Sequence, residues 1–166
     1  MKNIAKFMAA WVSGAVAGAA IVKKTFAKVI IAKDDDAEKF KVFFQMLNKW
    51  LLLKQQNKNI ADYFIRRNYK KIAIYGMGQL GETLFQELVR SGVEVVFGID
   101  RNKEHLDCGI DLYFPEEKMP HADVIIVTAV TYYSEIVWSL GRQVECPIES
   151  LENIIAELGR EEGIAI

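Results

Sequence analysis

A glycine-rich turn is the part of this sequence best suited to chemistry. Gly76, Gly78 and Gly81 have the spacing G-x-G-x-x-G, between the apolar run of residues 72–75 and an amphipathic segment that begins at Leu80. Gly76 permits a tight turn out of a strand, Gly78 lets backbone N–H groups approach a phosphate, and Gly81 lets a helix pack closely on the strand. The helix N-terminus also attracts anions. The motif therefore predicts phosphate binding by residues 76–81.

Asp100 extends the same predicted site. It ends the next apolar run, residues 93–99, and follows Gly81 by nineteen residues. A carboxylate at this distance accepts hydrogen bonds from a ribose diol, which favours NAD or another unphosphorylated ribose over NADP. Arg101 and Lys103 are the residues that could meet a 2′-phosphate instead. The alternative interpretation is that the glycines serve only the strand–helix crossing, in a domain that binds no ligand.

Segments typical of strands and helices alternate from residue 70 to residue 158. Val124–Val127 is fully apolar, as a central parallel strand is. Val144–Ile148 contains Pro147, so it is predicted to be an edge strand. Further strands are predicted at residues 93–99 and 110–114, and helices at residues 80–90, 132–140 and 151–158. The sequence predicts an α/β fold, with a small parallel Rossmann-like sheet of about five strands in the order 3-2-1-4-5.

The ligand of such a sheet lies outside the carboxyl ends of the strands, where the strand order reverses. Thr128 and Thr131 follow the apolar run of residues 124–127, so they are expected near the glycine turn and Asp100. They could equally be ordinary strand-end and helix-cap threonines. The predicted ligand-binding residues are Gly76, Met77, Gly78, Gln79, Leu80, Gly81, Asp100, Arg101, Thr128 and Thr131.

No catalytic set accompanies these residues. Tyr132 and Tyr133 are expected near the crevice, but neither has a lysine four residues later, so the tyrosine–lysine pair of short-chain dehydrogenases is missing. His105 and Cys108 form an H-x-x-C without a second half, and no metal site is predicted. The sequence therefore leaves enzymatic activity undecided and identifies no catalytic residue.

The first third of the chain has a different character. Phe7–Val22 has sixteen residues without a charge. A helix of that length covers about 24 Å, less than the roughly 30 Å of a bilayer core. Three interpretations remain open: a membrane anchor, a helix buried in a homo-oligomer, or a cleaved signal peptide. If the segment spans a membrane, the flanking lysines favour a cytoplasmic C-terminal domain at the inner face of the cell membrane.

A helical arm is predicted to follow the basic stretch that ends at residue 33. Asp35 and Glu38 have the spacing of a capping box, and Asn59 can cap a short helix over residues 60–67. Between them a broad apolar face recurs at helical spacing, and it is expected to pack on a neighbouring helix or domain. That face consists of Phe40, Phe43, Phe44, Leu47, Trp50 and Leu51. The predicted divisions are residues 1–33, 34–69, 70–158 and a tail of 159–166.

Charge and cysteine content exclude several classes of protein. The formal net charge is −1, so no basic field for nucleic acid is present and no nucleic-acid partner is predicted. The two cysteines are too few for a disulfide scaffold or a zinc cluster.

A family resemblance covers residues 70–158. The stretches KKIAIYGMGQLGETLFQEL, VVFGIDRN, LYFPEE, ADVIIVTAV and CPIESLENII resemble the small Rossmann-like nucleotide-binding domains of bacterial surface-polysaccharide biosynthesis proteins. Such domains occur at the C-terminus of sugar C-methyltransferases and at the N-terminus of sugar acyltransferases. The resemblance implies a nucleotide or nucleotide-sugar ligand contacted by Gly76, Gly78, Gly81 and Asp100, and a sugar-modifying enzyme as partner. Two alternatives remain: an NAD-dependent oxidoreductase completed by a partner subunit, and a scaffold without ligand that assembles through its N-terminal helices.

Overall fold

The computed structural model describes residues 37–161 and residue 163. The chain divides into two compact units, Met1–Phe43 and Phe44–Ile166. Residues 37–43, the described part of the first unit, are helical. The prediction for Phe7–Val22 lies outside the described residues. Within residues 37–161, no helix combines the length and the apolar character that crossing a bilayer requires.

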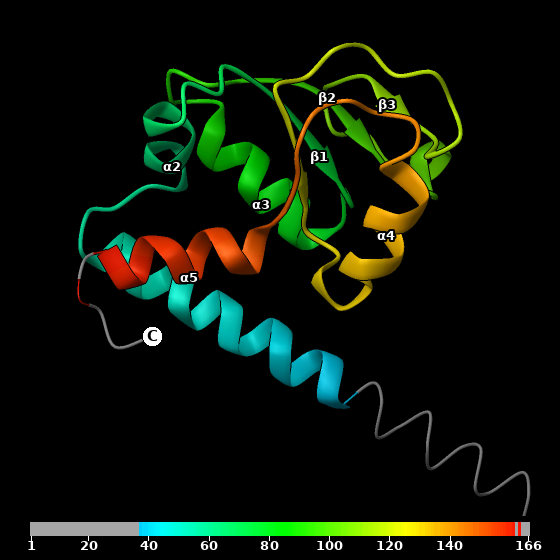
Figure 1. Cartoon of the computed structure of the whole chain (residues 1–166). Helices are drawn as coiled ribbons and strands as arrows, with labels where there is room; N and C mark the ends of the chain where they lie inside the picture. The colour runs from blue at the N-terminus through cyan, green and yellow to red at the C-terminus, as the bar shows by residue number, and fades with distance from the viewer. Residues whose placement is uncertain (1–36, 162, 164–166) are drawn as a thin grey trace, which may run out of the picture. The chain divides into compact units, whose positions relative to one another are not determined.

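The second unit is built on five parallel strands in the order β3-β2-β1-β4-β5, which confirms the predicted sheet (Figure 1). Tyr75 at the end of the central strand aligns with Ile99 on one side and Val127 on the other. The carboxyl ends of three neighbouring strands therefore meet at one edge. The strands are β1 (Lys71–Tyr75), β2 (Glu94–Ile99), β3 (Leu112–Tyr113), β4 (Val124–Val127) and β5 (Ile148–Ser150).

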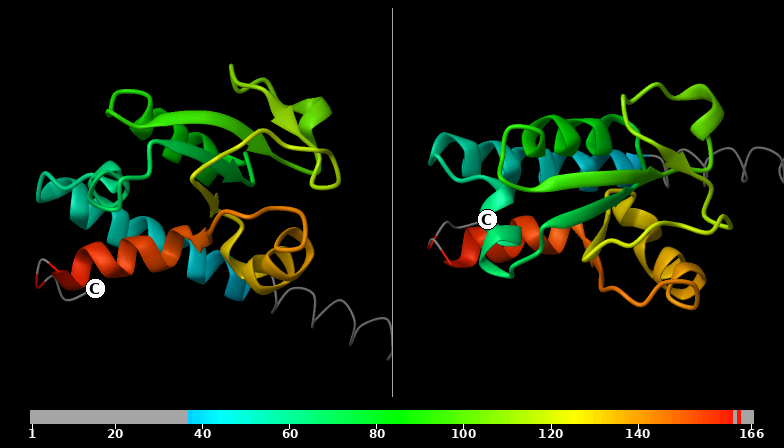
Figure 2. Two further views of the ribbon diagram at one scale, coloured as in Figure 1. Left: turned by 45° about the horizontal axis from the view of Figure 1, so that its top comes forward. Right: turned by 90° about the horizontal axis from the view of Figure 1, so that it is seen from above.

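Helices cover both faces of this sheet. In the right-hand view of Figure 2, α3 and α4 lie on opposite sides of the strands. The unit opens with a helix over residues 44–55, and α2 packs against α3 and α5. The labelled helices are α2 (Ile60–Arg66), α3 (Gln79–Leu88), α4 (Tyr133–Leu140) and α5 (Leu151–Glu161), and the two 3-10 turns are η1 (Lys103–His105) and η2 (Val130–Tyr132).

The connection from β3 to β4 crosses one face of the sheet without a helix. Its residues 114–123 are turns and loops, held by Glu117. The Glu117 carboxylate accepts the N–H of Phe114 at 2.6 Å and the ammonium of Lys103 at 2.6 and 2.8 Å. Ala122 and Met119 from this loop pack with Phe97. A loop therefore covers the part of the face where a crossover helix would otherwise lie.

The last strand begins later than predicted. Pro147 has no N–H to give to a ladder, and its carbonyl accepts the N–H of Ile125 at 2.9 Å just before β5 begins. Residues 144–147 therefore lead into the strand rather than form it. The predicted edge position is confirmed, because β5 is the last strand of the sheet order.

The second unit begins well before the predicted boundary at residue 70. Met46, Trp50 and Leu53 are buried. The indole N–H of Trp50 donates to Glu87 on α3 at 2.8 Å, and the N–H of Ile60 donates to the other oxygen of Glu87 at 2.7 Å. One carboxylate thus joins α3 to α2 and to the preceding helix. Residues 44–69 consequently belong to the same compact unit as the sheet, rather than to a separate arm.

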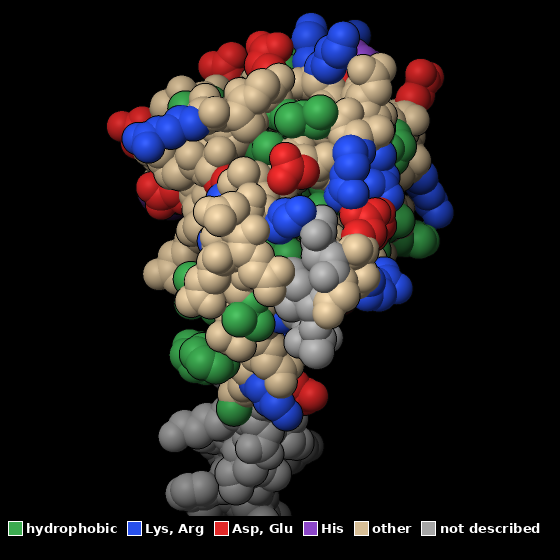
Figure 3. Space-filling view, turned by 90° about the vertical axis from the view of Figure 1, so that its left-hand side faces the viewer, with side chains coloured by type: hydrophobic (Ala, Val, Ile, Leu, Met, Phe, Trp, Pro, Cys, Tyr) green, Lys and Arg blue, Asp and Glu red, His purple; other side chains and the backbone are tan. Residues whose placement is uncertain are grey.

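Charged side chains of both signs cover this unit. On the face drawn in Figure 3, Lys and Arg side chains are interspersed with Asp and Glu, and hydrophobic side chains lie between them. Arg66 and Arg67 of the α2 end pair with Glu161 and Glu157 of α5. These pairs are partly exposed, so each contributes at most about 1 kcal/mol to the free energy of unfolding.

Candidate functional site at the carboxyl edge

The glycine turn leaves β1 in a conformation that needs glycine at its first position. Gly76 has φ +93°. A Cβ atom there would lie 2.7 Å from Thr128 Oγ1, too close for any side chain. The Gly76 N–H still donates to Ile99 O at 2.8 Å, so the turn begins on the β1–β2 ladder. The fold itself therefore accounts for this glycine.

The other two motif glycines differ from each other. A Cβ on Gly81 would lie 2.0 Å from Gly76 O, so α3 can pack this closely on the turn only with glycine at that position. A Cβ on Gly78 would meet no atom within 4 Å. Gly78 is the N-cap of α3, and it is exposed. The protein therefore does not require glycine at Gly78, and the missing side chain leaves open space in front of the helix.

The Asp100 carboxylate lies against the glycine turn. Its Oδ2 accepts the N–H of Met77 at 2.8 Å, and its Oδ1 accepts the N–H of Asn102 at 2.8 Å. One N–H of the turn is thus already used by the protein. Each carboxylate oxygen has a second acceptor position, and Asp100 is partly exposed. The carboxylate is therefore held in one orientation and can still accept hydroxyl donors.

Met77 belongs to the core through its side chain. It is 2% exposed and lies over Gly98 in β2. A Cβ on Gly98 would approach Met77 Cγ to 2.7 Å and Leu112 Cδ2 to 2.6 Å. Leu80 is buried too. Both residues were predicted as ligand contacts, and in each case the side chain packs inside the protein and leaves only the backbone for a ligand.

Thr128 ties β4 to the end of β1. It is buried, and its hydroxyl lies 2.5 Å from Gly76 O and 3.1 Å from Tyr75 O. The hydroxyl proton is therefore directed at main-chain carbonyls of the turn. Thr131 on η2 and Arg101 after β2 are exposed. Hydrogen bonds thus bring Gly76, Met77, Asp100 and Thr128 together, whereas Thr131 and Arg101 lie on the surface. Lys103 is engaged by Glu117.

The N-terminus of α3 supplies the remaining donors. The first N–H groups of a helix have no acceptor within the helix, and α3 has ten residues, long enough for an appreciable dipole. Gly78 O accepts the N–H of Glu82 at 2.9 Å, which fixes the first helical turn. Gln79, the first residue of α3, is exposed. The backbone here presents N–H groups beside the open space at Gly78.

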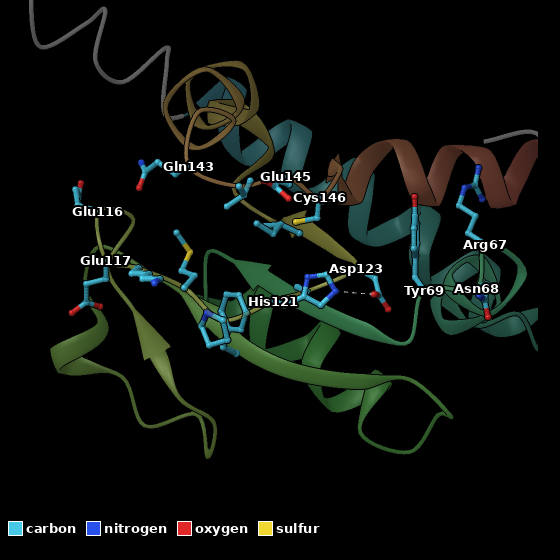
Figure 4. A pocket seen from close by; sticks show the side chains of 17 residues that line it. Arg67, Asn68, Tyr69, Glu116, Glu117, His121, Asp123, Gln143, Glu145 and Cys146 are labelled. Carbon is cyan, nitrogen blue, oxygen red and sulfur yellow. Dashed lines mark ion pairs between the residues drawn. The ribbon is translucent and has the colours of Figure 1, made fainter.

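A large cavity lies at the opposite, amino edge of the sheet, and the sequence did not predict it. Its volume is about 890 Å³. Figure 4 shows His121, Asp123 and Cys146 near its middle and Arg67 towards one end. Asp123 directly precedes β4, and Cys146 lies two residues before β5. The glycine turn, Asp100 and Thr128 contribute nothing to its lining. The cavity lies beside the helix-free connection of residues 114–123.

The polar groups of this cavity do not make an activated nucleophile. Burial raises the pKa of the Cys146 thiol, and the nearby Asp123 charge acts in the same direction, so the thiol stays protonated at neutral pH. His121 Nε2 lies 3.5 Å from Asp123 Oδ1. Asp123 Oδ2 accepts the N–H groups of Lys70 at 2.7 Å and Lys71 at 2.8 Å. Within residues 37–161, no group of three His, Cys, Asp or Glu side chains is arranged to hold a metal ion.

No protein-family model matches this chain, and no curated protein is similar to it. The assignment of a function therefore depends on the geometry of the carboxyl edge.

Proposed function

We propose that this protein binds a nucleotide or nucleotide-sugar at the carboxyl edge of its sheet. The observation that carries the proposal is the contrast among the motif glycines. Gly76 and Gly81 are required by contacts within the protein, whereas a Cβ on Gly78 would touch nothing. A phosphate approaching the N–H groups of α3 would occupy that open space.

Asp100 is the group proposed to bind the ribose. The N–H groups of Met77 and Asn102 hold its carboxylate at the end of β2, 2.8 Å from each. An acceptor fixed in advance loses little entropy when a ribose diol donates to it. A carboxylate in this position repels a 2′-phosphate, so NAD, ADP or an unphosphorylated nucleotide-sugar is favoured over NADP.

The resemblance to domains of surface-polysaccharide biosynthesis proteins supports a nucleotide-sugar as the ligand. In the proposed role, the protein is a binding module that acts beside a sugar-modifying enzyme, held at a membrane or in an oligomer by its N-terminal residues. This role assigns the main-chain N–H groups of Gly78–Gly81 to the phosphates and Asp100 to the ribose.

The test is a thermal-unfolding series of the full chain with NAD, NADP, ADP and UDP-sugars. A ligand at one hundred times its dissociation constant raises the free energy of unfolding by about 2.7 kcal/mol. The Gly78→Val variant is expected to lose this stabilisation while remaining folded, because the added side chain meets ligand rather than protein. Gly92→Val is the matched control, since a Cβ on Gly92 also meets nothing within 4 Å. Unchanged binding by Gly78→Val would exclude a phosphate at this turn.

A further inference from the structure

A second cavity of the unit is a groove among helices, and the proposed nucleotide site does not use it. The groove has a volume of about 730 Å³. Its apolar walls are Leu47, Trp50, Leu51 and Ile65, from the helix of residues 44–55 and from α2. We call this cavity the helical groove. Its charged rim consists of Lys54, Asp62, Glu87 and Arg90.

Large apolar side chains stand exposed around the helical groove. Phe44 is 62% exposed, Leu51 is 54% exposed and Ile65 is 56% exposed. Phe44, Leu47 and Leu51 are spaced by three and four residues, so they share one face of the helix. At 100° per residue, that face lies about 120° around the helix from the buried face. The buried face consists of Met46, Trp50 and Leu53. The sheet core therefore covers one of two apolar faces of this helix.

We propose that the helical groove is the interface of a symmetric dimer, in which Phe44 of each copy enters the groove of the other. A two-fold interface requires one patch to carry both the projecting group and the hollow that receives it. The exposed Phe44 ring and the groove at Leu47 and Leu51 lie on the same helix face. Each copy therefore provides both the projecting Phe44 ring and the groove that receives the ring of the other copy.

The charges at the rim favour a second copy of the chain. Lys54 and Arg90 balance Asp62 and Glu87, and Lys54 Nζ lies 3.2 Å from Glu87 Oε1. A rim without net charge does not repel an identical rim, whereas a rim of one sign would. The rim therefore has no net charge that a partner of opposite charge would neutralise.

The exposed apolar surface is large enough for a weak dimer. With on the order of 200 Å² for a large side chain, the exposed parts of Phe44, Leu51 and Ile65 amount to roughly 300 Å² per copy. Apolar atoms make up somewhat more than half of an interface, so two copies would bury about 1,000 Å² in total. That area is at the lower limit for specific interfaces. An interface of this size is expected to be weak and transient.

The test is sedimentation velocity of the full chain over a concentration range of about 1 to 100 μM, where a micromolar dimer dissociates. Phe44→Glu is expected to weaken self-association at least tenfold. Gln45→Glu is the matched control, because it adds the same charge to the adjacent exposed residue on the polar side of the helix. Both variants should keep the melting temperature of the parent, since both side chains point into solvent.

Cysteine cross-linking locates the contact. In a Cys108→Ser and Cys146→Ser background, Leu51→Cys should form a covalent dimer with a short bis-maleimide, and Gln45→Cys on the polar side should not. The proposal is overturned if the chain is monomeric throughout the concentration range, or if Phe44→Glu and Gln45→Glu associate as the parent does. It is also overturned if Phe44 is needed only for co-sedimentation with vesicles of anionic phospholipid.

Discussion

The two edges of the parallel sheet use an aspartate in the same way but differ in the space around it. Asp100 at the carboxyl edge accepts the N–H groups of Met77 and Asn102. Asp123 at the amino edge accepts those of Lys70 and Lys71. At the carboxyl edge, open space lies in front of Gly78, beside the first N–H groups of α3. At the amino edge lies a cavity of about 890 Å³.

In the proposed function, cavity size and ligand-binding chemistry are separate properties of this unit. The amino-edge cavity lies where a loop replaces a crossover helix, so it follows from the length of one connection. The carboxyl edge presents oriented main-chain N–H groups beside the open space at Gly78, the kind of donors that attract phosphate. Ligands of open α/β sheets bind at the carboxyl edge for this reason.

The largest effect is expected at Gly81. Gly81→Ala should lower the free energy of unfolding by about 3 kcal/mol, because the added Cβ meets the Gly76 carbonyl and overpacks the strand–helix crossing. The ideal Cβ position lies 2.0 Å from that oxygen. Urea unfolding measures the loss. Gly92→Ala has open space and should change stability by less than about 0.5 kcal/mol. Equal stability of the two variants would show that Gly81 is not packed as described.

The next largest effect concerns the choice between NAD and NADP, which we expect the carboxyl edge to determine. NAD should bind at least about tenfold more tightly than NADP, a difference of about 1.4 kcal/mol, because Asp100 repels a 2′-phosphate. Asp100→Asn should reduce that ratio. Asp123→Asn, at the other edge, should leave it unchanged. Isothermal titration with both cofactors measures the ratio, and tighter binding of NADP to the parent would discard the role of Asp100.

The amino edge should respond to acid through Asp123. The N–H groups of Lys71 and Lys70 lower the pKa of Asp123 below its usual value of 3.8. A lowered pKa in the folded state means that the carboxylate stabilises the fold above the unfolded-state pKa, and that this contribution is lost as the pH falls through the folded-state pKa. Asp123→Asn should cost about 1 kcal/mol at pH 7.

The measurement is the urea midpoint of the parent and of Asp123→Asn at several pH values. The difference between the two proteins should begin to shrink below about pH 4, where the unfolded carboxylate takes up its proton, and should be lost at lower pH as the folded carboxylate is protonated. A difference that stays constant down to about pH 2.5 would contradict the hydrogen bonds to Lys70 and Lys71.

The smallest effect is expected at Tyr75, the last residue of β1, whose side chain belongs to the core. Its hydroxyl is buried, and it has no hydrogen-bond partner among the described residues. Tyr75→Phe should therefore leave stability unchanged or raise it by up to about 1 kcal/mol. Tyr133→Phe is the control, because the Tyr133 hydroxyl donates to Ile148 O at 2.9 Å and its loss should destabilise. Destabilisation by Tyr75→Phe would reveal an ordered partner for the hydroxyl.

The sheet could be predicted because each of its strands and turns is indicated by residues that are close together in the sequence. The apolar run of residues 124–127, the glycine turn and Pro147 each predict one feature of the observed order. The helix of residues 60–67 was predicted from Asn59, and the structure places α2 at Ile60–Arg66, with the Asp62 carboxylate accepting the Asn59 N–H. Short-range patterns of burial and capping were sufficient for these elements.

The details of the site could not be predicted because they depend on contacts between distant residues. The sequence suggests Asp100 as a ligand residue, but its hydrogen bond to Met77 spans 23 positions. The bond from Trp50 to Glu87 spans 37 positions, and without it residues 44–69 look like a separate arm. One residue does indicate this packing in the sequence. A glycine within a strand marks a close approach of another group, and at Gly98 that group is the Met77 side chain.

The loop between β3 and β4 determines where the hydrogen bonds of the sheet open most easily. β1 and β4 each have a neighbouring strand on both sides. β3 pairs only with β2, through two residues, and Glu117 holds the loop that follows it. We therefore expect local opening to cost little at this corner. The N–H of Gly98 donates to Asp111 O and the N–H of Asp100 donates to Tyr113 O, and we expect these two amides to exchange with water before those of β1. Because Asp100 directly follows β2 and accepts the Met77 N–H of the glycine turn, we expect fluctuations of this corner to reach the turn, and a bound nucleotide to slow exchange at both places.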